Sequence, residues 1–72
     1  MEIDYQLIVN KLRADLENLA EQDAEFRKKV NLKDNSSMIC QHRAYISALN
    51  DTLKAQAERY RVGYKPIQER FP

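Results

Sequence analysis

Residues 4–31 read DYQLIVNKLRADLENLAEQDAEFRKKVN, and their apolar side chains recur in alternating steps of four and three. The positions of this stripe are Tyr5, Val9, Leu12, Leu16, Leu19, Asp23, Phe26 and Val30. Such spacing places the stripe along one side of an α-helix that packs against another helix. Asp4 stands where an N-cap is needed, and the basic run 27–29 complements the helix dipole in the last turn. We therefore predict a first helix over about residues 4–31.

A second stripe follows a short polar break that is rich in Asp, Asn and Ser, the residues that favour turns and helix starts. Its positions are Ile39, His42, Ile46, Leu49, Leu53, Gln56 and Tyr60. Gly63 is placed to adopt a left-handed conformation after the helix, and Pro66 prevents the helix from resuming. These signals predict a loop at residues 32–35, a second helix over about residues 36–62 and an extended tail over residues 63–72.

The 72 residues leave room for one domain, so we expect residues 1–72 to form a single all-α unit, a two-helix antiparallel hairpin with a short C-terminal extended tail. Chains of this length rarely stabilise themselves from one thin core. A line of small residues on the second helix (Cys40, Ala44, Ala48 and Ala55) would admit another helix at close range. We therefore expect a homodimer that forms a four-helix bundle, with docking on a partner protein as the other option.

The residues that enzymes use are sparse. One Gly cannot build a phosphate-binding loop, and the single Cys40 and His42 lie two positions apart on a helix, so they point in different directions. Position 39 is Ile, which excludes the Glu-x-x-His motif of di-metal helical bundles. We expect no catalytic activity, no cofactor and no metal site.

Two ionisable residues interrupt the stripes, Asp23 in the first and His42 in the second. If residues 30 and 37 face each other across the turn, residue 23 lies opposite residue 44, within one turn of His42. We interpret Asp23 and His42 as a polar pair in the core that sets the helix register, with ligand contact or pH sensing as the functional alternative.

Basic residues gather at the loop end of the hairpin, although the net charge of the chain is only +1. They are Arg27, Lys28, Lys29, Lys33 and Arg43. This basic loop end is either a set of solvated helix-end charges or a binding patch for an anionic partner. A nucleic acid or a nucleotide is the corresponding alternative ligand.

The tail carries Tyr64, Ile67 and Phe71 and is either a strap folded over the helices or a docking peptide.

We interpret the chain as a small protein-interaction module (adaptor, inhibitor or assembly factor) that binds another protein, a role that would suit a phage or mobile-element accessory protein. No apolar run approaches the roughly 18 residues of a membrane span, and the acidic N-terminus is unlike a signal peptide. We expect a cytoplasmic protein with no membrane contact.

Overall fold

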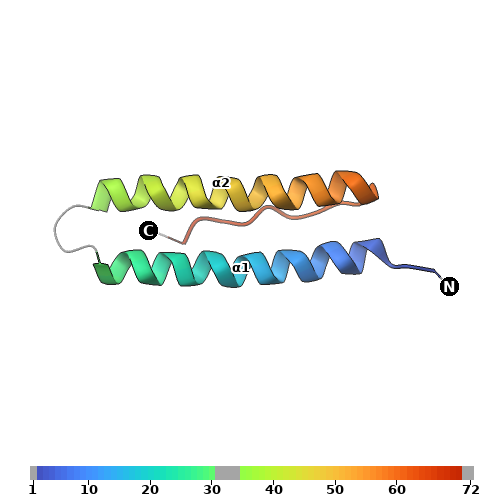
Figure 1. The fold of residues 1–72 in the computed structure, drawn as a ribbon, viewed down its shortest axis with the longest axis horizontal. Helices are drawn as coiled ribbons and strands as arrows, with labels where there is room; N and C mark the ends of the chain where they lie inside the picture. The colour runs from blue at the N-terminus through green and yellow to red at the C-terminus, as the bar shows by residue number, and fades with distance from the viewer. Residues whose placement is uncertain (1, 31–34, 71–72) are drawn as a thin grey trace.

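The computed structural model describes residues 2–30 and 35–70. Two helices, α1 (Tyr5–Val30) and α2 (Asn35–Tyr60), run antiparallel and pack against each other along an elongated body 54 Å long (Figure 1). This arrangement confirms the predicted all-α two-helix hairpin. Most of the predicted loop, residues 32–34, lies outside the described residues, and α2 includes residue 35.

The first helix begins where the sequence predicts. Asp4 Oδ1 accepts a hydrogen bond from the backbone N–H of Leu7, 3.1 Å away, which is the N-cap interaction with the third helical residue. The basic run Arg27–Lys29 occupies the last turn of α1, where positive charge opposes the negative end of the helix dipole. Local signals alone therefore account for both ends of α1 to within one residue.

The second helix ends two residues earlier than predicted, and Gly63 is not its stop signal. Arg61 instead takes the left-handed conformation, with φ of 56°. The N–H of Val62 bonds to the carbonyl of Ala57 at 3.0 Å, and the N–H of Arg61 bonds to that of Glu58 at 3.2 Å. These two bonds form a Schellman motif, which brings Val62 against the core beside buried Ala57. That apolar contact offsets the strain of a left-handed arginine.

The core is a single line of buried residues between the helices, and α1 presents a different side to it than the stripe predicts. The buried hydrophobic residues are Val9, Leu16, Ala20, Ala24, Ile46, Leu49, Leu53, Ala57 and Ile67. Leu19 and Phe26 are exposed, although the stripe predicts that they are buried. Ala20 and Ala24 are buried instead. In a straight α-helix, residues spaced seven apart shift by about 20° around the axis with each repeat. The side of α1 that faces α2 is therefore taken by residues one position later in the sequence than the stripe predicts.

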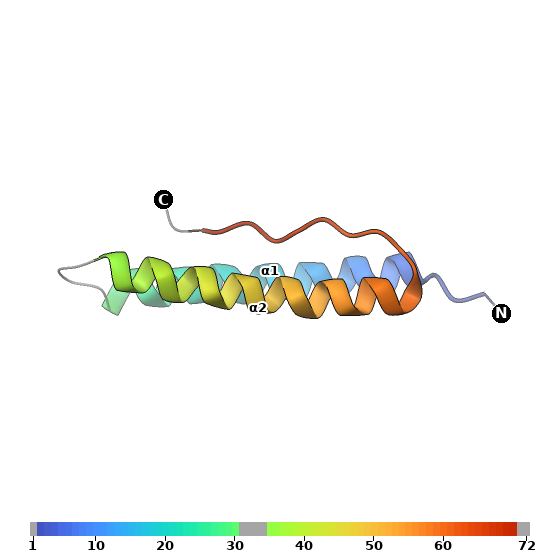
Figure 2. The same ribbon diagram turned by 90° about the horizontal axis from the view of Figure 1, so that it is seen from above.

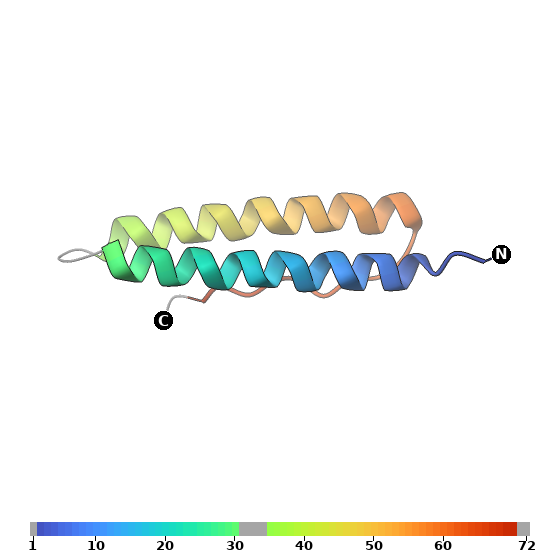
Figure 3. The same ribbon diagram turned by 60° about the horizontal axis from the view of Figure 1, so that its bottom comes forward.

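The tail returns along the helix pair. After Arg61 the chain reverses and runs in extended form over residues 62–70, on one side of the two helices (Figures 2 and 3). Ile67 is only 3% exposed and belongs to the core, while Val62 and Tyr64 are partly buried against it. The described part of the tail thus completes the core as a third layer. Phe71 lies outside the described residues.

Candidate functional site

Asp23 and His42 meet between the two helices. His42 Nδ1 lies 2.8 Å from Asp23 Oδ2, and Arg27, one turn later on α1, places its Nε 2.9 Å from the same oxygen. The His42 side chain is fully buried, and the Asp23 carboxylate is 13% exposed. The polar interruption of each stripe therefore lies beside that of the other, and an arginine from the basic loop end is bound to the pair.

The tail contacts the other ring nitrogen of His42. The backbone N–H of Arg70 donates to His42 Nε2 at 2.9 Å. Because an N–H can donate only to an unprotonated ring nitrogen, the hydrogen-bond pattern assigns the ring proton to Nδ1, which donates to Asp23. His42 thus connects a carboxylate on α1 with the backbone of the tail.

The pKa of Asp23 lies below its ordinary value of 3.8. Burial of the carboxylate raises this pKa, but the hydrogen bonds from Arg27 and His42, together with the electrostatic effects of the same two side chains, outweigh the effect of burial. The charged form is therefore favoured in the folded protein.

Acid should weaken the fold through Asp23. A carboxyl group with a lower pKa in the folded state stabilises fully above its unfolded pKa, and this contribution disappears as the pH falls through the folded pKa. We expect Asp23→Asn to reduce the loss of unfolding free energy between about pH 5 and about pH 3, measured by urea denaturation. Asp51→Asn is the matched control, because Asp51 is exposed and has no ion pair among the described residues. An unchanged acid dependence in Asp23→Asn would contradict the assignment.

Three other side chains bind the backbone of the tail. Asn50 of α2 donates to the carbonyl of Ile67 at 3.1 Å and accepts from its N–H at 2.7 Å. Arg13 of α1 donates to the carbonyls of Lys65 and Pro66. Gln6 of α1 donates to that of Gly63. Sequence reasoning missed all three, because polar residues on the flank of a helix look like ordinary surface positions until the tail is placed.

The basic loop end is partly neutralised within the chain. Arg27 is bound to Asp23 and Gln41, and Arg43 pairs with Glu69 of the tail at 3.0 Å. Lys28 and Lys29 are exposed, and Lys33 lies outside the described residues. Since both arginines already have carboxylate partners, the positive charge left for a phosphate group is smaller than the sequence suggests.

A band of apolar residues lies on the side of the helices away from the tail. We call it the open face; by helical spacing it consists of the exposed Ile8, Leu19 and Phe26 of α1 and the partly buried Leu12 of α1, Met38 and Tyr45 of α2. Leu19 is 42% exposed and Phe26 is 64% exposed. On α1, Gln6 contacts the tail, and Ile8, two positions later, is rotated about 200° around the helix axis. Sequence reasoning included Leu19 and Phe26 in the intramolecular seam and so missed this surface.

No further described segment covers the open face, because the tail occupies the opposite side of the pair (Figure 2).

Neither helix is long and apolar enough to cross a membrane, within the part of the chain that the structure describes. Over the same residues, no group of three or more His, Cys, Asp or Glu side chains is placed to hold a metal ion. Comparisons with protein-family models, with curated proteins and with solved structures found no match.

Proposed function

We propose that this protein is a non-catalytic interaction module and that the open face is where it binds a second copy of itself to form a four-helix bundle. The observation that carries the proposal is the exposure of Leu19 and Phe26, two large apolar side chains seven residues apart on one side of α1. Contiguous exposed apolar surface of this kind marks an interaction site. In this role the dimer acts as an adaptor, inhibitor or assembly factor.

The open face is complementary to itself, which favours a second copy as its occupant. A two-fold axis brings the same surface of the two copies together, and an axis perpendicular to the helices makes the two α1 helices antiparallel. With the axis level with residue 17, Ile8 of one copy faces Phe26 of the other. In the same arrangement, position 11 of one copy lies opposite position 23 of the other. Exposed Lys11 is then within reach of exposed Glu25 of the other copy, so opposite charges meet beside the apolar contact.

The homodimer can be tested by sedimentation equilibrium at micromolar concentration, where we expect a mass near twice 8.5 kDa. Changing Leu19 and Phe26 together to Gln should give the monomer mass while the helical circular dichroism signal is retained, because both side chains are exposed in the single chain. A wild-type mass of 8.5 kDa at every concentration up to the millimolar range would contradict the dimer.

A charge reversal tests the direction of packing. Lys11→Glu alone should weaken the dimer at low salt, because it places a negative charge near Glu25 of the other copy. The double variant Lys11→Glu, Glu25→Lys should restore the dimer. A failure of the double variant to restore it would rule out the antiparallel arrangement, while leaving the open face as the interface.

A further inference from the structure

The tail is held in the way that a bound peptide is held. Within the described part of the tail, six hydrogen bonds join side chains of the helices to backbone atoms: Gln6 to Gly63 O, Arg13 to Lys65 O and Pro66 O, Asn50 to Ile67 N and O, and His42 to Arg70 N. Both helices contribute to this set. Because the bonds go to backbone atoms, they recognise an extended chain with little regard to its side chains.

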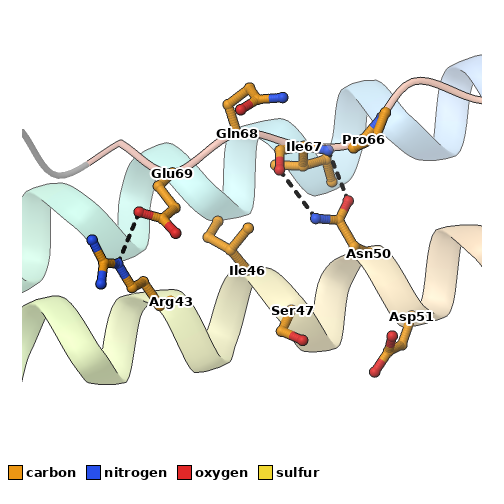
Figure 4. A pocket seen from close by; sticks show the side chains of 9 residues that line it. All are labelled: Arg43, Ile46, Ser47, Asn50, Asp51, Pro66, Ile67, Gln68 and Glu69. Carbon is orange, nitrogen blue, oxygen red and sulfur yellow. Dashed lines mark hydrogen bonds and ion pairs between the residues drawn. The ribbon is translucent and has the colours of Figure 1, made fainter.

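Ile67 is the buried side chain of the described part of the tail. Ile67 is 3% exposed, whereas its neighbours Pro66 and Gln68 are exposed. Asn50 binds both backbone groups of Ile67 and so places the side chain at one position along the groove (Figure 4). Pro66 has no N–H to satisfy and is preset to an extended conformation. The groove is therefore suited to an extended segment in which a branched aliphatic residue follows a proline.

The resident tail fits this groove imperfectly. The Nε atom of Arg70 is buried without a hydrogen-bond partner among the described residues, although its NH2 group lies 3.8 Å from Glu17. An open groove of about 530 Å³ lies beside the anchor, between α2 and the tail, and is bordered by Ser47 and Asp51 (Figure 4). A buried unpaired polar atom and unfilled space both leave room for a better ligand.

We propose that the groove between α1 and α2 is a binding site for an extended segment of a partner protein, in which proline precedes isoleucine or valine, and that residues 63–70 occupy it in the free chain. The partner segment displaces the tail. Its larger side chains fill the open space beside Ile67 that Ser47 and Asp51 border. Gly63, at the start of the tail, has no Cβ to restrict its backbone angles, so the chain can change direction at this point. The site lies opposite the open face and does not depend on the dimer.

The probe is a fluorescent peptide with the sequence of residues 62–72, whose binding to the full chain is followed by fluorescence anisotropy. In the wild-type chain the tethered tail competes with the peptide. The full-length Ile67→Asn variant loses its own anchor, so we expect it to bind the peptide at least about tenfold more tightly than the wild type does. A peptide with Asp at the anchor position should not bind.

Two added substitutions show whether the peptide uses the groove. Asn50→Ala in the Ile67→Asn background should weaken binding about tenfold, because two backbone hydrogen bonds are lost. Thr52→Ala should have no effect, since among the described residues the Thr52 hydroxyl bonds to its own helix at the carbonyl of Ala48. Unchanged binding after Asn50→Ala, or no binding to a helical Ile67→Asn chain, would overturn the proposal.

The test also works if Ile67→Asn weakens the fold. The peptide should then restore the helical circular dichroism signal, and a failure to restore it would overturn the proposal. If the tail is instead exchanged between two copies, the chain with Leu19→Gln and Phe26→Gln, whose open face is disrupted, would still sediment as a dimer and would become a monomer when Ile67→Asn is added. That result would overturn the proposal, because a second copy would then be the occupant.

Discussion

Replacing Leu53 with Ala is expected to lower the free energy of unfolding by about 2–5 kcal/mol. Leu53 is fully buried and stands in the middle of the single line of core residues. Leu53→Ala would leave a cavity, and the small core offers few neighbouring side chains that could move in to fill it. The change can be measured by urea denaturation followed by circular dichroism, with an unchanged slope showing that the unfolding transition remains the same.

Leu7→Ala is the matched control, because it removes the same atoms from a side chain that is 49% exposed. Its effect should be within about 0.5 kcal/mol. Equal losses for Leu53→Ala and Leu7→Ala would show that the core does not lie where the structure places it.

Replacing His42 with Phe is expected to cost about 3 kcal/mol, because the change breaks a buried polar network while retaining a ring of similar size. Asp23 would lose one of its two donors, and the N–H of Arg70 would lose its acceptor. The same denaturation measurement applies. We also expect faster amide hydrogen exchange at Arg70, which would report separately on the loss of its hydrogen bond.

Two amide variants separate the two bonds of His42. Asn carries a donor close to the position of Nδ1, so His42→Asn should keep the contact with Asp23 and lose the contact with the tail. Gln reaches the position of Nε2, so His42→Gln should favour the tail instead. Faster exchange at Arg70 in the Asn variant than in the Gln variant is the expected order. A cost below about 0.5 kcal/mol for His42→Phe would contradict the network.

The sequence predicted the contact between Asp23 and His42 only approximately. Counting back from the turn places residue 23 opposite residue 44, and the structure has Asp23 beside His42, two positions away. What the count does not include is the third member, the backbone of Arg70, which reaches His42 only because the tail folds back. The tautomer of His42 therefore depends on a contact across 28 residues of sequence.

The open face and the tail groove could not be predicted from the sequence, each for its own reason. Leu19 and Phe26 match a helical stripe as well as Leu16 does, and only the rotation of α1 against α2 decides which of them is buried. Asn50 and Arg13 are polar residues on helix flanks, and their partners are backbone atoms, which carry no signal in the sequence.

By itself, the sequence determined the two helices, their antiparallel pairing and the start of α1, because capping and periodicity act between residues within a few turns of each other. The tertiary structure decided the rotation of α1, the end of α2 at Tyr60 and the path of the tail. Each of these depends on burial across distant parts of the chain: the contact of Val62 with the core selects the left-handed Arg61, and the burial of Ile67 draws the tail over the helices. The free energy of such contacts outweighs the local preference of Gly63 for a helix end.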